Sequence, residues 1–150
     1  MEKRQTHQLQ LKSVDQIGIV VRDIDKVIAS WSKLFGLGPW TFRDVSGKDA
    51  EGRPIKARLA FTSLGSVQLE LIQPVEGRLF HSEFLDKHGE GLHHLGFFVD
   101  DFEGEVNNLL AQGAKVLSSG PGNYAYFDTG GPGGVIYELI RKSVMEGMRR

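Results

Sequence analysis

Two glutamates interrupt two otherwise apolar segments of this sequence in the same local pattern. Glu70 lies within Val67–Ile72 and Glu138 within Val135–Ile140, and both segments read V-x-x-E-L-I. A carboxylate inside an apolar strand costs free energy unless it is paired, hydrogen-bonded or bound to a cation. A single glutamate of this kind usually just faces solvent on the wet side of an antiparallel sheet. Two glutamates at matching places of a repeat favour a shared chemical role instead.

The repeat extends to a second pair of polar residues. Segments 14–23 and 92–101 superpose without a gap, which places Gln16 on His94. An approximate twofold axis between the repeats would bring Gln16, Glu70, His94 and Glu138 toward one centre. One imidazole, one amide oxygen and two carboxylates suit a divalent ion such as Zn, Co, Ni, Mn or Mg. The four residues therefore form a candidate metal site.

Each donor pair belongs to a repeated unit of one strand, one helix and three further strands. The segments that carry Gln16 and His94 each end in an aspartate, Asp23 or Asp101, placed to cap the helical pattern that follows. Two more strand candidates precede each glutamate-bearing strand. The repeat predicts an α+β fold of two tandem βαβββ modules, with a helix on the outer face of each sheet. The inner faces of the two sheets would form a cup-shaped cavity.

The repeat also sets the expected boundaries. A single domain is predicted over 14–140, with module 1 at 14–74, a linker helix at 77–90 and module 2 at 92–140, while 1–13 and 141–150 have the composition of polar tails. The stretch 44–54 between two strands of the first module is expected to be a hairpin loop.

Composition excludes several classes of function. The chain has 150 residues, 40% of them hydrophobic, which suits one globular domain. Its net charge of -1 gives no field that would attract nucleic acid or an anionic membrane. The absence of cysteine excludes disulfides and thiolate metal sites. Its longest apolar stretches are strand-sized, well short of the ~20 residues that span a bilayer. We expect a cytoplasmic protein with a small-molecule partner, and neither a nucleic acid nor a membrane partner.

Three motifs carry a resemblance to a known superfamily. Residues 15–21 read D-Q-I-G-I-V-V, residues 70–74 read E-L-I-Q-P and residues 84–94 read F-L-D-K-H-G-E-G-L-H-H. They resemble the D-H-I-G-I-A-V, E-L-L-x-P and F-L-x-K-x-G-x-G-x-H-H segments of methylmalonyl-CoA epimerases in the vicinal oxygen chelate superfamily. This superfamily also includes glyoxalase I, extradiol dioxygenases and antibiotic-resistance binding proteins. The resemblance covers residues 14–140. It includes the doubled βαβββ pattern, which is similar to that of the superfamily.

The resemblance implies both a ligand set and a reaction. The metal ligands of the family fall on Gln16, Glu70, His94 and Glu138, and a divalent ion held there would polarise a substrate carbonyl. Glu138 is then the expected base and Glu70 the second acid that epimerisation requires. The implied function is a metal-dependent isomerase or epimerase that removes the proton α to a carbonyl, for example that of a 2-substituted acyl-CoA such as methylmalonyl-CoA. The resemblance also implies a homodimer.

Gln16 departs from the histidine found at this position of the epimerases. A Gln/Glu/His/Glu set is similar to that of some zinc-dependent glyoxalase I enzymes, so one alternative is a glyoxalase I-type lyase acting on thiol adducts of 2-oxoaldehydes. The set argues against an extradiol dioxygenase, whose Fe(II) requires two histidines and one carboxylate. An amide oxygen is a weaker donor than imidazole, so the other alternative is a metal-free small-molecule binding protein.

Candidate substrate contacts come from side chains on the same strands. Lys56 and Arg58 alternate along the third strand of the first module, where they could meet a carboxylate or the phosphates of a CoA ester. A solvated strand face is an equal alternative for both. Trp40, Phe98, Tyr124 and Tyr126 could line an apolar wall of the cavity, although aromatic residues on strands more often belong to the core.

Overall fold

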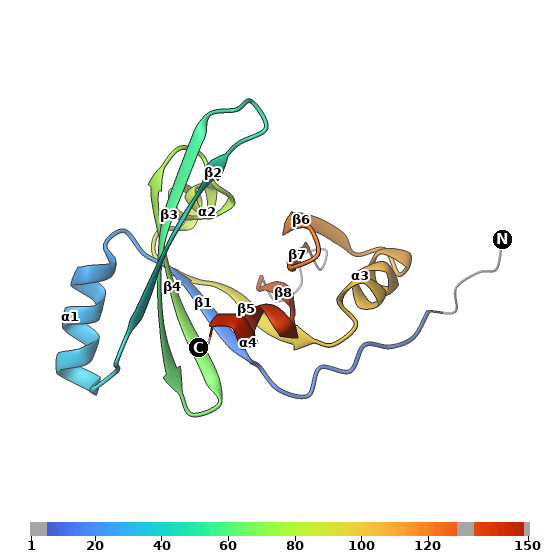
Figure 1. The fold of residues 1–150 in the computed structure, drawn as a ribbon, viewed down its shortest axis with the longest axis horizontal. Helices are drawn as coiled ribbons and strands as arrows, with labels where there is room; N and C mark the ends of the chain where they lie inside the picture. Colours follow the sequence, from blue (N-terminus) through green and yellow to red (C-terminus); the bar gives the residue numbers. More distant parts are fainter. Residues whose placement is uncertain (1–5, 129–133, 149–150) are drawn as a thin grey trace. The chain divides into compact units, whose positions relative to one another are not determined.

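The computed structural model of the chain describes residues 6–128 and 134–148. Its elements follow the predicted order, one βαβββ module after another, and confirm the α+β class. They are β1 (Gln16–Val20), α1 (Ile24–Phe35), β2 (Thr41–Lys48), β3 (Pro54–Leu64), β4 (Val67–Glu76), α2 (Phe80–His88), β5 (Gly91–Val99), α3 (Phe102–Ala111), β6 (Lys115–Gly120), β7 (Tyr124–Asp128), β8 (Ile136–Arg141) and α4 (Lys142–Met148) (Figure 1).

The chain divides into two compact units. Gln16–His93 forms the first unit, and residues 6–15 together with the described part of His94–Arg150 form the second. The second unit therefore includes a segment that precedes the first module in the sequence. The predicted cup, which would need both units, stays a prediction.

The first unit is a four-stranded sheet with α1 on one face. Its strand order is β2-β3-β4-β1, in which β1 runs parallel to β4 and the other neighbours are antiparallel. Val21, Ile24, Ala60 and Leu71 form the buried core between α1 and the sheet. Figure 1 shows α1 lying along this face beside the three antiparallel strands. The glutamate at 70 alternates with Leu71 along β4, so its side chain lies on the opposite face.

Helix α1 begins at the cap that the sequence predicts and ends at a glycine. The Asp23 side chain accepts a hydrogen bond of 3.1 Å from the backbone N–H of Lys26 and caps the first turn. Gly36 ends the helix in the left-handed conformation, with φ of 66°, and its N–H donates to the carbonyl of Ser32. Apolar residues spaced three and four apart between these caps form the buried face of the helix.

Removal of the Asp23 cap should measurably destabilise the protein. We expect Asp23→Ala to lower the free energy of unfolding by about 1 kcal/mol, because one amide of the first turn loses its acceptor. Asp23→Ser is the matched control, since a serine hydroxyl can accept the same hydrogen bond. Urea unfolding followed by circular dichroism measures both variants. Equal unfolding midpoints for the alanine variant and the parent would show that this cap contributes nothing.

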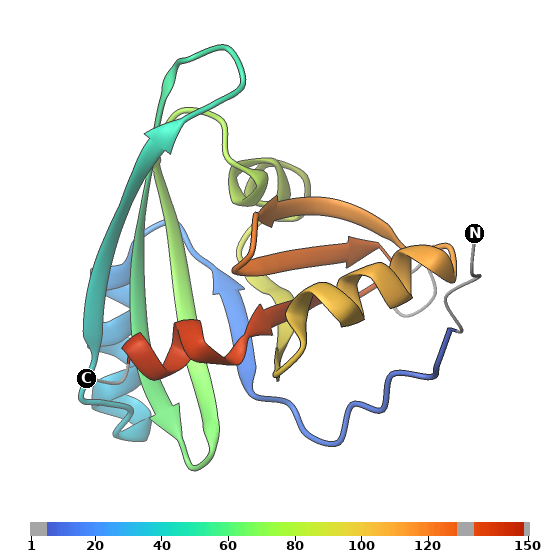
Figure 2. The ribbon, with the colours of Figure 1, turned by 45° about the vertical axis from the view of Figure 1, so that its right-hand side comes forward.

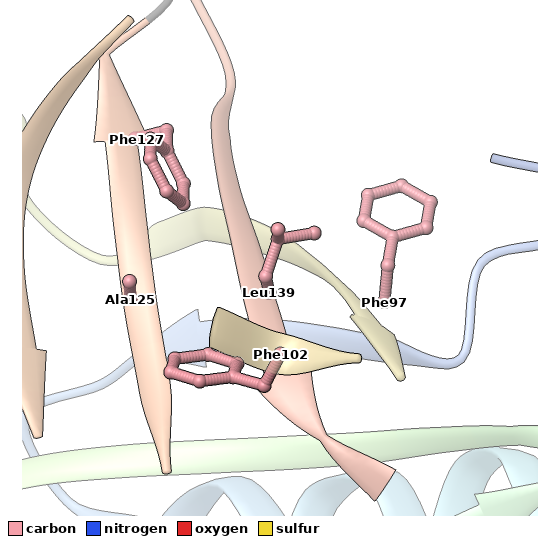
Figure 3. Packing of buried hydrophobic residues seen from close by; sticks show 5 residues of the cluster. All are labelled: Phe97, Phe102, Ala125, Phe127 and Leu139. Atoms are coloured by element: carbon pink, nitrogen blue, oxygen red, sulfur yellow. The ribbon is translucent and has the colours of Figure 1, made fainter. Parts of the chain in front are cut away.

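The second unit repeats the same layout. Its sheet has the order β5-β8-β7-β6, with β5 parallel to β8 and the other pairs antiparallel. Helix α3 covers one face, as Figure 2 shows. The buried cluster between the helix and the sheet consists of Phe97, Phe102, Ala125, Phe127 and Leu139, drawn in Figure 3. The Asp101 side chain caps α3 by accepting a hydrogen bond of 3.1 Å from the N–H of Gly104, so both predicted aspartate caps are confirmed.

The loop expected over 44–54 is much shorter in the structure. Strand β2 continues to Lys48, so only residues 49–53 connect it to β3. Asp49 organises this turn, because its side chain accepts hydrogen bonds from the backbone N–H of Glu51 and from the N–H and side chain of Arg53. Desolvation pushes the pKa of the Asp49 carboxyl upward, but the hydrogen bonds and the positive charge of Arg53 outweigh it and hold that pKa below its ordinary value.

The two expected polar tails are also more ordered than predicted. The backbone N–H of His7 donates to Asn108 of α3 over 3.0 Å, and Leu9 packs against the core of the second unit. At the other end, residues 142–148 form α4, in which Met145 is 3% exposed. Residues 1–5 and 149–150 of these predicted tails lie outside the described residues. Within the described part of the chain, no helix is both long and apolar enough to span a membrane.

Candidate functional site

His94 and Glu138 form a buried pair inside the second unit. They come from the neighbouring parallel strands β5 and β8, where Glu138 stands opposite Gly96, two residues along from His94. His94 Nε2 lies 2.9 Å from Glu138 Oε2, and the two residues are 0% and 5% exposed. Alternation along each strand puts both side chains on the face opposite the α3 core. The structure thus brings together two of the four predicted donors.

Gln16 and Glu70 occupy the equivalent places in the first unit. Strands β1 and β4 are parallel, and Glu70 stands opposite Gly18, two residues along from Gln16. The exposed fractions are 3% for Gln16 and 8% for Glu70. Their side chains lie on the face away from α1, because the alternate residue Leu71 belongs to the α1 core. The predicted equivalence of the two donor pairs is therefore found in the strand registers as well.

A glycine stands opposite each glutamate. Gly18 pairs with Glu70 and Gly96 with Glu138, and both glycines are buried. Glycine brings no side chain of its own, so neither carboxylate has a side chain directly opposite it on the neighbouring parallel strand.

Two tyrosines of β7 accompany the second pair. Tyr126 stands opposite Glu138 in the antiparallel register, and its ring meets that of His94 edge-on with the centroids 5.1 Å apart. Tyr126 is 5% exposed, whereas Tyr124 is 37% exposed and lies 5.7 Å from Tyr126 between ring centroids. Phe98 shares the strand face of His94 and is half-buried. These three predicted contacts lie on the same face as the His94–Glu138 pair.

The other predicted substrate contacts lie on the helix-covered side of the first unit. Lys56 forms an ion pair with Glu76, with Nζ and Oε2 3.1 Å apart. Arg58 donates to Asp25 at the start of α1 over 2.9 Å, which raises the pKa of the Arg58 guanidinium above its already high value. Trp40 packs against the α1 core. The structure differs here from the prediction, because the residues of β3 that face the same side as Glu70 are the odd-numbered ones.

That face holds residues that the sequence analysis missed. Phe61 stands opposite Glu70, and Arg43 of β2 stands opposite Leu59, which in turn is opposite Ile72. Since residues paired across a sheet point to the same side, Arg43 lies on the face that carries Glu70. Gln68 is opposite Gln16 and contacts it directly. The one sequence signal for Gln68 as a site residue is the alternation along β4, which puts Gln68 and Glu70 on the same face.

His93 has a different environment from its neighbour His94. It is 2% exposed and packs against the rings of Phe80, His81 and Phe84, with centroid distances of 5.0, 4.7 and 4.9 Å. All three contacts come from α2. His93 therefore belongs to the packing of α2.

The donor chemistry fits a divalent ion. Among the described residues no three His, Asp or Glu side chains are gathered as a preformed metal site. Each unit by itself still presents two adjacent donors on one sheet face. His94 Nε2 and Glu138 Oε2 lie 2.9 Å apart, the distance of a direct hydrogen-bonded ion pair. An imidazole nitrogen and carboxylate oxygens are both ligands that divalent ions accept.

The resemblance in sequence is matched by a family model. The model that describes the glyoxalase/bleomycin resistance protein/dioxygenase superfamily matches residues 15–129, from the start of β1 to the end of β7. The chain belongs to this superfamily. Members of the superfamily commonly bind a divalent metal.

Several known proteins are similar to this chain at modest identity. An uncharacterized protein of Bacillus subtilis, YqjC, is 29% identical over 111 residues, which cover 74% of each chain. A variant of Streptomyces coelicolor methylmalonyl-CoA epimerase in complex with 2-nitronate-propionyl-CoA is 23% identical, with a TM-score of 0.70 over 89% of this chain and 96% of that one. The epimerase of Mycobacterium tuberculosis is 24% identical, with a TM-score of 0.64 over 90% and 93%. These structures show a common fold.

Proposed function

We propose that this protein is a metal-dependent isomerase or epimerase that removes the proton α to the carbonyl of a 2-substituted acyl-CoA, such as methylmalonyl-CoA. The observation that carries the proposal is the buried His94–Glu138 pair, 2.9 Å apart on one sheet face. The equivalent pair of Gln16 and Glu70 supports it, as does the presence of a CoA ligand in a structurally similar epimerase.

Each residue has a distinct part in the proposal. Gln16, Glu70, His94 and Glu138 would hold the ion, which when bound supplies a positive charge that stabilises an enolate oxygen. Glu138 would remove the α-proton, and Glu70 would supply the proton that replaces it. A carboxylate so placed contributes a rate factor of about a hundredfold or more. Gly18 and Gly96 stand opposite the two carboxylates and bring no side chain of their own to these places.

Substrate contacts are assigned by sheet face. Tyr126, Tyr124 and Phe98 line the face of the His94–Glu138 pair and offer apolar surface to the acyl group. Arg43 shares the face of Glu70 and would meet a carboxylate or phosphate group of the substrate, for which a guanidinium is well suited. We also propose that the enzyme is a homodimer and that it is located in the cytoplasm.

The test begins with metal content. The protein is loaded in turn with Zn, Co, Ni, Mn and Mg, desalted and analysed for bound metal. We expect ~1 ion per chain in the parent and none in a Glu70→Ala, Glu138→Ala double variant. A Glu51→Ala, Glu83→Ala double variant is the matched control, because both side chains are exposed. If the parent retains no ion, the metal-dependent mechanism is excluded and a metal-free binding protein is left.

The loaded protein is then incubated with methylmalonyl-CoA in D2O. Incorporation of deuterium at C2, followed by mass spectrometry, is the expected result. Full metal occupancy without deuterium incorporation would reject this substrate class.

Gln16 favours one second candidate function. Because a Gln/Glu/His/Glu set resembles that of some glyoxalase I enzymes, the same loaded protein should be tested on the adduct of methylglyoxal with a thiol. Both reactions start by removal of a proton next to a carbonyl, so the proposed site serves either. Turnover of the thiol adduct without deuterium incorporation into the acyl-CoA would favour the lyase.

A further inference from the structure

The amide of Gln16 differs from the other three proposed ligands in one respect. A carboxylate offers two oxygens and a neutral imidazole offers a ring nitrogen, but a carboxamide has one oxygen and one NH2 group. Only the oxygen can bind a cation. Gln16 is 3% exposed, so water cannot freely satisfy the NH2 group in either orientation. Something in the protein must determine which end of this amide is presented.

Gln68 is placed to do so. It stands directly opposite Gln16 in the parallel register of β1 and β4. Gln16 Nε2 donates to Gln68 Oε1 over 2.8 Å, a short and well-formed amide hydrogen bond. The bond occupies the NH2 end of Gln16 and so directs the oxygen away from Gln68.

The repeat supplies an independent comparison. The position equivalent to Gln68 in the second unit is Ile136, which stands opposite His94. The side chain of Ile136 cannot form a hydrogen bond, and the imidazole opposite it has two ring nitrogens rather than an oxygen end and an NH2 end. Of these two equivalent positions, the polar residue, Gln68, is the one opposite the amide ligand Gln16.

We propose that Gln68 is a positioning residue that fixes the amide of Gln16 with its oxygen directed away from Gln68, the orientation in which that oxygen would bind the divalent ion. The inference rests on the proposed metal site and extends it by one residue outside the ligand set. Hydrogen-bond partners of metal ligands typically change metal affinity by about 10- to 100-fold when they are removed.

The experiment measures Co2+ affinity and the visible absorption of the bound Co2+. Gln68→Met keeps the size of the side chain but removes the acceptor, and we expect it to weaken Co2+ binding about tenfold or more. Gln68→Glu keeps an acceptor for Gln16 Nε2 and should rescue the affinity. The absorption spectrum should change in Gln68→Met, because loss of one oxygen ligand alters the coordination, and should be restored in Gln68→Glu.

A double-mutant cycle separates positioning from a general structural effect. In the Gln16→His background the ligand is an imidazole, and Gln68→Met should then cost nothing in Co2+ affinity. An equal loss in both backgrounds would overturn the proposal, because the effect would not depend on the amide. Thermal unfolding of the metal-free variants verifies the fold, and Gln68→Ala replaces Gln68→Met if the latter does not fold.

The outcomes distinguish this inference from the proposed function. A parent that binds Co2+ while Gln68→Met binds it equally well, with the same spectrum, overturns the role of Gln68 alone. A parent that binds no Co2+ overturns the metal site and the role of Gln68 together.

Discussion

Glu138→Gln is expected to slow the exchange of the substrate α-proton with solvent by about a hundredfold or more, because an amide cannot accept that proton. The substitution preserves the shape of a side chain that is 5% exposed. It also leaves an oxygen that can contact His94 Nε2. The rate of deuterium incorporation into methylmalonyl-CoA in D2O, measured at equal metal occupancy, reports the effect.

Glu83→Gln is the matched control for this variant. Glu83 is an exposed residue in the first turn of α2, so the same change of charge should leave the exchange rate unaltered. Full activity in Glu138→Gln with bound metal would remove Glu138 from the role of base. The Glu70→Gln variant would then be examined for the same loss.

The donor pairs could be predicted from the sequence because the repeat contains them in full. The shared V-x-x-E-L-I segments give the spacing of the two glutamate-bearing strands, and Asp23 and Asp101 mark the helices that follow the first strand of each module. The structure confirms both features. It adds that each glutamate stands opposite a glycine, Gly18 or Gly96, which depends on pairing between strands far apart in the sequence.

The faces of β2 and β3 could not be predicted in the same way. Alternation along one strand says which residues share a face, but only the register with a neighbour says which face that is. Lys56 and Arg58 alternate regularly with Ala60 in the pairing with β2, and Ala60 belongs to the α1 core, so both side chains lie on the α1 face. An irregularity in the pairing between Lys56 and Ala57 further shifts the register at this end of β3.

The extents of β2 and α4 were missed for a different reason. Every residue of β2 is exposed, so the strand carries no apolar alternation that would reveal its length. Its end is set by the Asp49 turn, in which one side chain satisfies several backbone groups. Helix α4 is short and has Met145 as its buried residue among those described, too little for a periodic pattern.

His94→Leu should reduce the stability of the metal-free protein by about 3–5 kcal/mol, the usual cost when one member of a buried pair is removed. Glu138, 5% exposed, would keep its carboxylate in the same place without the imidazole 2.9 Å away. Leucine fills a similar volume, so the loss would arise mainly from the uncompensated carboxylate. Urea unfolding at neutral pH measures the change.

The single variant Glu138→Leu and the double variant His94→Leu, Glu138→Leu complete a double-mutant cycle. With both polar groups replaced by apolar side chains, most of the lost stability should return, since a buried pair often contributes little over well-packed hydrophobic residues. A coupling free energy near zero in this cycle would mean that the two side chains are independent in the folded protein. We expect strong coupling between the two side chains in the metal-free state and loss of metal binding in every variant of the cycle. These results would show that the pair serves metal binding and contributes little net stability.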